Sequence, residues 1–164
     1  MKKAFILSFV ALVLSLSTQA DDGSAKAVKT LESISDNTLR QFGSIFFRAS
    51  DVKWSMNSSY QKATFKLNGK PSYAIYGYNS QLLVATQTAS TEELPAKAQQ
   101  SLKTNFADFT ITKAVKVISR PADYQFNDDT NHYWVSLVNE KKQVILLISP
   151  SADITIVSTK ALGS

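Results

Sequence analysis

Two segments of the chain carry the same order of apolar residues and turns, and this repetition limits the fold more than any other feature. Phe65–Thr88 aligns with Leu137–Lys160 over its whole length without a gap. Both segments alternate apolar and polar residues around a short turn, Asn68-Gly69 in the first and Glu140-Lys141 in the second. This pattern predicts two β-hairpins. The alternative is a chance likeness, because all hairpins share these turn and alternation rules.

Each hairpin follows a segment with apolar residues at helical spacing. These residues are Leu39, Phe42, Ile45 and Phe46 before the first hairpin, and Leu94, Ala98, Leu102 and Phe106 before the second. Ser90 with Glu93 forms a capping-box pattern, and Pro95 suits the first turn of a helix. Asp36 and Asn37 are candidate caps for the earlier helix.

The sequence therefore predicts an α+β fold. It consists of a tandem duplicated unit, a helix followed by an antiparallel four-stranded meander, with the helices packed on one face of the sheet. The units are expected at 21–88 and 89–164, forming one compact domain, and residues 25–35 fit either a helix or an extra strand. A polar loop, Arg120–Asn131, lengthens the second unit. The expected strands are Val52–Met56, Tyr60–Leu67, Lys70–Tyr76, Leu82–Thr88, Lys113–Ile118, His132–Val138, Gln143–Ile148 and Ile154–Thr159.

The segment Met1–Ala20 has the layout of a secretory signal peptide. Lys2 and Lys3 precede the apolar run Phe5–Leu16, and cleavage is expected after Ala20. An uncleaved anchor is the alternative, but the run is shorter than the roughly 20 residues that span a bilayer. The mature chain is therefore predicted to be periplasmic or secreted, without a membrane segment after cleavage.

Charge and cysteine content exclude several classes of function. Removal of Lys2 and Lys3 leaves 16 of the 18 basic residues against 13 acidic ones, without a run of like charge, so nucleic-acid binding is not predicted. The chain has no cysteine and one histidine, His132, which excludes cysteine catalysis and a two-histidine metal site. No Gly-x-Ser-x-Gly frame accompanies His132, and the acidic loop around Asp128-Asp129 does not match an EF-hand. We predict no catalytic residue, no metal site and no cofactor.

An ordered set of segments resembles the PepSY-like family of small exported bacterial proteins, also described as β-lactamase-inhibitor-protein-like. The segments are VKW (52–54), YQKATF (60–65), NGK (68–70), ELPAKAQQSL (93–102), NFADFTITKAVKV (105–117) and YWVSL (133–137). The likeness extends over about Asp36 to Lys160. One departure is the absence of glycine from the turns at 78–81 and 150–153, although Asn and Asp tolerate turn geometry. The resemblance implies helices on one sheet face and a protein partner on the other.

Alternation assigns the two faces of each hairpin. A two-residue turn at Asn68-Gly69 pairs Ala63 with Ala74 and Phe65 with Ser72, which makes their face the core. In the second hairpin the corresponding residues are Tyr133, Val135, Leu137, Val144, Leu146 and Ile148. A register shift of one residue would exchange the faces.

The other face carries aromatic residues among lysines, which are side chains suited to a binding surface. We predict that Tyr60, Lys62, Tyr73, Ile75 and Trp134 contact a protein partner. The function expected is that of an exported, non-enzymatic binding module that inhibits or modulates a periplasmic or secreted enzyme. The alternative is that Tyr, Ile and Trp occur here because they favour β-strands, and that a neighbouring part of the chain covers them. The sequence also fits a small-ligand-binding or envelope-sensing protein, or an enzyme of unrecognised type.

Overall fold

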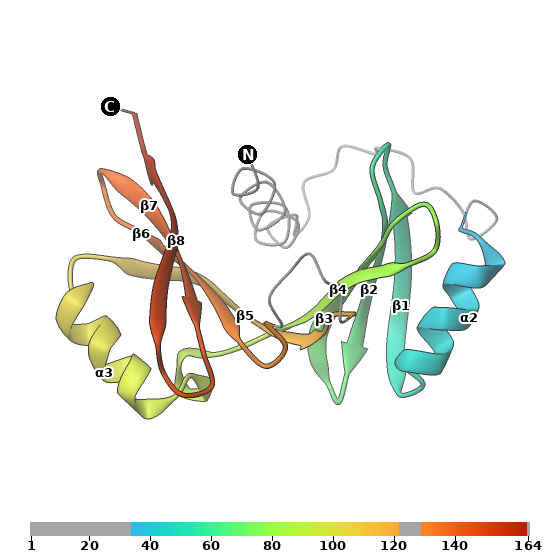
Figure 1. The fold of residues 1–164 in the computed structure, drawn as a ribbon, viewed down its shortest axis with the longest axis horizontal. Coiled ribbons are helices and arrows are strands. Elements are labelled where there is room, and N and C mark those ends of the chain that lie inside the picture. Colours follow the sequence, from blue (N-terminus) through green and yellow to red (C-terminus); the bar gives the residue numbers. More distant parts are fainter. Residues whose placement is uncertain (1–33, 122–128, 164) are drawn as a thin grey trace. The chain divides into compact units, whose positions relative to one another are not determined.

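The computed structural model describes residues 34–121 and 129–163, which contain two α-helices, one 3-10 helix and eight strands (Figure 1). The predicted signal peptide lies outside these residues. So do residues 25–33, which fit both a helix and a strand, and residues 122–128 of the polar loop.

All eight strands belong to one antiparallel sheet, in which each strand lies beside its neighbours in sequence. The predicted fold class, two tandem units that each have a helix and a four-stranded meander, is therefore wrong, because the strands form one eight-stranded sheet. The order β1 to β8 runs through the sheet without a break. The strands are β1 (Ala49–Met56), β2 (Gln61–Leu67), β3 (Lys70–Tyr76), β4 (Leu82–Thr88), β5 (Thr110–Ser119), β6 (Tyr133–Val138), β7 (Lys142–Ile148) and β8 (Ile154–Ala161).

The two expected meanders join at β5, which is also longer than the predicted strand Lys113–Ile118. It runs for 10 residues, and the Ala89 N–H, directly after β4, donates to the Ala114 carbonyl at 3.0 Å. Ala114 packs in one hydrophobic cluster and Ile118 packs against the other. A sheet that ended at β4 would expose a row of unpaired backbone groups, which pairing with β5 satisfies. Local alternation cannot reveal this pairing, since it is the same in every strand of a meander.

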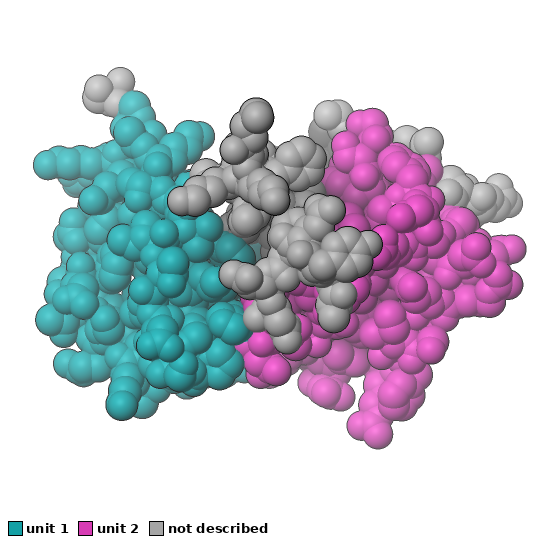
Figure 2. Space-filling model, viewed as in Figure 1, with its two compact units in different colours: residues 1–24, 89–115, 132–164 teal, residues 25–88, 116–131 magenta. Residues whose placement is uncertain are grey.

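Contacts divide the chain into two compact units (Figure 2). The described residues of unit 1 are 89–115 and 132–163, and those of unit 2 are 34–88, 116–121 and 129–131. Strand β5 contributes to both units.

The core of unit 2 is an aromatic cluster beneath helix α2 (Asp36–Ile45). The helix begins at Ser35, whose hydroxyl accepts a hydrogen bond from the Thr38 N–H at 3.2 Å, so the cap lies one residue before the predicted candidates. The rings of Phe42 and Phe46 each lie 5.0 Å from the ring of Phe65 on β2. The other buried members are Ile34, Trp54, Ala63, Ala74, Tyr76, Leu82 and Ala85. The small residues Ala63 and Ala74, both fully buried, leave room for the rings that α2 brings to the sheet.

The core of unit 1 is aliphatic and lies against helix α3 (Ala96–Asn105). The predicted capping box is confirmed in the 3-10 helix η2 (Thr91–Glu93), where the Ser90 N–H donates to the Glu93 carboxylate at 2.9 Å. The buried members are Ala89, Leu94, Ala98, Leu102, Ala114, Val135, Leu137, Val144, Leu146 and Ile148. The predicted core face of the second hairpin is thus confirmed, with Tyr133 partly buried.

The predicted register of the first hairpin is confirmed: Ala63 lies opposite Ala74 and Phe65 opposite Ser72. Asn68 and Gly69 have φ values of 54° and 78°, as a two-residue hairpin turn requires. The pairing Gln61–Tyr76 recurs in the second hairpin as Tyr133–Ile148. The repeat in the sequence therefore corresponds to two hairpins with the same register. Both hairpins belong to one continuous sheet.

Tyr76 is a core residue with a buried hydroxyl group. Its side chain is fully buried, and its Oη forms no hydrogen bond within the part of the chain that the structure describes. Burial raises the pKa of this phenol. A buried hydroxyl without a partner destabilises the folded state, because it loses hydrogen bonds to water on folding.

We therefore expect Tyr76→Phe to leave the free energy of unfolding unchanged or to raise it by about 1–3 kcal/mol. Urea denaturation measures this change. The matched control is Tyr78→Phe: the Tyr78 hydroxyl donates to the Asn57 carbonyl, so its removal should lower stability slightly. A clear loss of stability in Tyr76→Phe would show that the buried hydroxyl has a partner in solution.

Candidate functional site

The five predicted contact residues differ in accessibility. Tyr60, Lys62, Tyr73 and Ile75 belong to unit 2, and Trp134 belongs to unit 1. Tyr60, Ile75 and Trp134 are buried, with 7%, 3% and 6% of their surface exposed. Lys62 and Tyr73 are only partly buried. Of the predicted set, these two are the residues most open to a partner.

Lys62 and Tyr73 contact each other on the face of the sheet opposite the aromatic core. The Lys62 Nζ lies 4.9 Å from the centre of the Tyr73 ring, a distance typical of a cation–π interaction. Thr64 lies directly opposite Tyr73 and Ile75 opposite Lys62, so the lysine and the tyrosine are diagonal neighbours. Burial lowers the pKa of the Lys62 ammonium, because loss of water disfavours its charged form.

Two further lysines project from this face. Lys53 on β1 lies opposite Thr64, and Lys66 lies opposite Pro71 on β3. The Lys66 Nζ is 2.8 Å from the Asp51 carboxylate, and both side chains are more than half exposed. Their hydrogen bond lowers the pKa of Asp51. We call Lys53, Lys62, Thr64, Lys66 and Tyr73 the basic strip, because three of its five residues are lysines.

The apolar part of the same face is closed to solvent. Ile75 lies opposite Val84, and their exposed fractions are 3% and 1%. Val117 is fully buried and alternates with Ile118, which packs against the core of unit 2, so Val117 points to the opposite face. None of the three belongs to the aromatic cluster. The residues of the basic strip are therefore more accessible than these apolar residues.

On the corresponding face of unit 1, Trp134 neighbours a polar network that the sequence did not single out. The Thr112 hydroxyl donates to the Ser136 carbonyl, with 3.2 Å between the oxygens. The Gln143 side chain donates to the Ser136 hydroxyl at 3.0 Å. These bonds join β5, β6 and β7, and Ser136 is 3% exposed. Thr112, Ser136 and Gln143 interrupt the apolar pattern of three neighbouring strands, and this is the sequence signal that could have predicted the network.

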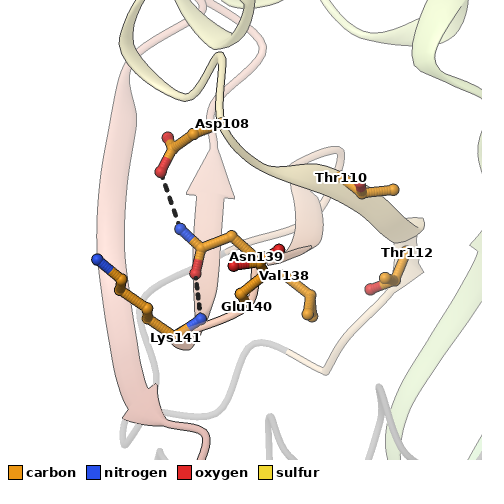
Figure 3. Close-up of a pocket in the computed structure, with 7 residues that line it drawn as sticks. All are labelled: Asp108, Thr110, Thr112, Val138, Asn139, Glu140 and Lys141. Carbon is orange, nitrogen blue, oxygen red and sulfur yellow. Dashed lines mark hydrogen bonds between the residues drawn. The ribbon is translucent and has the colours of Figure 1, made fainter.

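Unit 1 also carries an open pocket of about 530 Å³ beside the turn between β6 and β7 (Figure 3). It is lined by Asp108, Thr110, Thr112, Val138, Asn139, Glu140 and Lys141. The Asn139 amide donates to the Asp108 carboxylate at 2.8 Å, and its oxygen accepts from the Lys141 N–H at 3.0 Å. These polar groups hold the turn, and the pocket lacks the enclosed apolar walls of a typical small-molecule site.

The groups considered for catalysis or metal binding lie apart from these features. His132 is partly buried and directly precedes β6. Residues 34–121 and 129–163 contain no group of three or more His, Asp or Glu side chains placed to hold a metal ion. Asp129, from the acidic loop, forms an ion pair with Arg120.

Comparison with solved structures identifies the fold. A BLIP-like protein from Bacteroides fragilis superposes with a TM-score of 0.64 at 16% sequence identity, covering 79% of this chain and 87% of that protein. The chain has the BLIP-like fold. A DUF2874 family protein from Bacteroides uniformis has a TM-score of 0.62 at 14% identity, covering 78% of this chain and 89% of its own. A protein from Bacteroides eggerthii, named provisionally as periplasmic, has a TM-score of 0.60 at 14% identity, with coverages of 77% and 88%.

Sequence comparison adds no closer assignment within the BLIP-like fold. No family model matches the chain, and no curated protein sequence matches it. The resemblance to PepSY-like proteins therefore stays a prediction. None of the helices in residues 34–121 and 129–163 is both long enough and apolar enough to cross a bilayer.

Proposed function

We propose that this chain is an exported, non-enzymatic binding module that recognises an acidic surface of a protein partner through the basic strip. The BLIP-like fold supports this proposal, as do the exposed Lys53 and Lys66 and the partly buried Lys62 beside Tyr73. The partner is expected to be a periplasmic or secreted protein, which binding would inhibit or modulate.

The observation that carries the proposal is the contact between Lys62 and Tyr73. Aromatic side chains contribute a large contact area with few rotatable bonds, and they are enriched at the residues that dominate binding. The cation–π contact holds both side chains in place before a partner arrives, which reduces the entropy lost on association. Lys53 and Lys66 add positive charge on the same face, and complementary charge accelerates encounter with an acidic partner.

Export is part of the same proposal. A leader that is cleaved after Ala20 would deliver the chain to the periplasm or beyond. The provisional name of the Bacteroides eggerthii protein is consistent with this location. Membership of the PepSY-like family is the finer assignment that we propose within the BLIP-like fold.

The test is capture of partners from the native envelope by the mature protein, followed by titration with each purified partner. We expect Lys62→Ala combined with Tyr73→Ala to weaken binding at least about tenfold, as loss of a central contact pair does. The association rate should also fall as salt rises, because salt screens the lysines.

The matched control is Phe47→Ala, which removes an aromatic side chain that is 75% exposed and lies outside the basic strip. It should leave both capture and affinity unchanged. If the double variant and the unmodified protein bind every captured protein equally well, the basic strip is not the contact surface. Trp134→Ala is unsuitable for this test, since Trp134 is buried and its truncation would disturb the fold.

A further inference from the structure

Strand β8 has an outer edge that no described strand covers (Figure 1). The strand is last in the sheet order, and every one of its residues is exposed or half-buried, with Ile156 57% exposed. Its first part, Ile154–Thr159, carries no charge and is largely β-branched. An uncharged edge of this kind presents backbone N–H and C=O groups to any strand that approaches it.

Strand β1, at the other end of the sheet order, is protected against such pairing. Its register shifts between Ser50 and Lys53, and Asp51 between them has a φ of 54°. Asp51 also pairs with Lys66 at the edge. Bulges and charged side chains are the usual means by which proteins prevent edge-to-edge association. β8 has one register shift, at Val157, but no charged residue before Lys160.

We propose that β8 pairs antiparallel with β8 of a second copy of this chain and forms a two-fold symmetric dimer. Two antiparallel copies of one strand are related by a two-fold axis, so this edge complements itself. An extended segment of another protein would instead need its own matching sequence.

The position of Lys160 and the faces of the side chains favour one register between the two β8 strands. If Val157 lies opposite Ser158 of the second copy, Lys160 lies opposite the uncharged Thr155, and the two lysines stay apart. Ile156 then lies opposite Thr159 of the second copy. Both residues project from the core side of the sheet, since within one chain they pair with the buried Leu146 and Val144. The exposed Ile156 side chain would thus gain a contact with the methyl group of Thr159 of the second copy.

The contact involves one strand and a few side chains from each copy, so its area is small and its affinity modest. Sedimentation velocity of the mature protein, from about 1 µM to about 1 mM, covers the affinities expected of such a contact. We expect a reversible, concentration-dependent change from monomer to dimer.

Ile156→Lys and Thr159→Lys are each expected to weaken dimerisation at least tenfold, because they place charge on the uncharged edge. Both residues are exposed, so the monomer should still fold, which circular dichroism checks. The matched control is Val52→Lys, at a 39% exposed position of the protected strand β1, and it should dimerise like the unmodified protein. Tyr73→Ala should also leave dimerisation unchanged, since the basic strip is in unit 2 and β8 is in unit 1.

Three results would each overturn the proposal. One is a protein that stays monomeric over the whole concentration range. Another is a dimer that both lysine variants of β8 leave intact. The third is association that continues beyond the dimer, since a two-fold edge contact closes after two copies.

Discussion

Replacing Phe65 with alanine is expected to lower the free energy of unfolding by about 3–5 kcal/mol, the usual cost of truncating a buried phenylalanine. Only 2% of the Phe65 surface is exposed, and its ring meets those of Phe42 and Phe46, each at 5.0 Å. Its removal would leave a cavity that the two rings from the α2 segment cannot fill without moving away from their other contacts. Urea or thermal denaturation measures the loss.

The matched control is Phe47→Ala. Phe47 is 75% exposed, and the guanidinium of Arg48 lies 5.2 Å from its ring centre, so its removal should change stability little. The double variant with Phe42→Ala should lose less than the sum of the single losses, since both rings belong to one cluster. If Phe65→Ala and Phe47→Ala unfold at the same denaturant concentration, the aromatic cluster does not hold unit 2 together.

The hairpins were predictable because their determinants are local. Alternation fixes which residues share a face, and Asn68-Gly69 permits the positive φ values of a two-residue turn. Together they determine the register that places Ala63 opposite Ala74 and Phe65 towards α2. The helices were predictable for the same reason, since Phe42 and Leu102 follow a period that needs no knowledge of distant residues.

The single sheet was not predictable from these signals. Pairing after β4 depends on β5, which begins only at Thr110, after η2 and α3, and each edge presents the same backbone groups to any other strand. Alternation likewise assigns Ile75 and Trp134 to a face without showing whether that face is covered. Lys62 and Tyr73 are partly exposed, whereas Ile75 and Trp134 are buried, and alternation alone does not distinguish these two cases.

The second large loss of stability is expected from breaking the buried ion pair between Arg120 and Asp129. Arg120 and Asp129 are each 9% exposed at the side chain and are joined by two hydrogen bonds, from Nε to Oδ1 and from an Nη to Oδ2, the latter 3.0 Å long. Arg120→Ala is expected to lower the free energy of unfolding by about 3–5 kcal/mol, because the buried Asp129 side chain would lose the ion pair and the two hydrogen bonds that Arg120 donates. Chemical denaturation of the variant tests this value.

Two further variants test whether the loss comes from breaking a buried ion pair, since breaking an exposed one should cost little. Lys66→Ala breaks the exposed pair with Asp51 in the same unit, and we expect almost no change, because water already solvates both groups. Arg120→Met combined with Asp129→Leu removes both buried charges and keeps most of the volume, so it should recover most of the stability lost in Arg120→Ala. A double variant as unstable as Arg120→Ala would instead assign the loss to packing of the arginine side chain. In that case the stability that this pair contributes would come from the packing of the Arg120 side chain, and not from pairing of the Asp129 carboxylate.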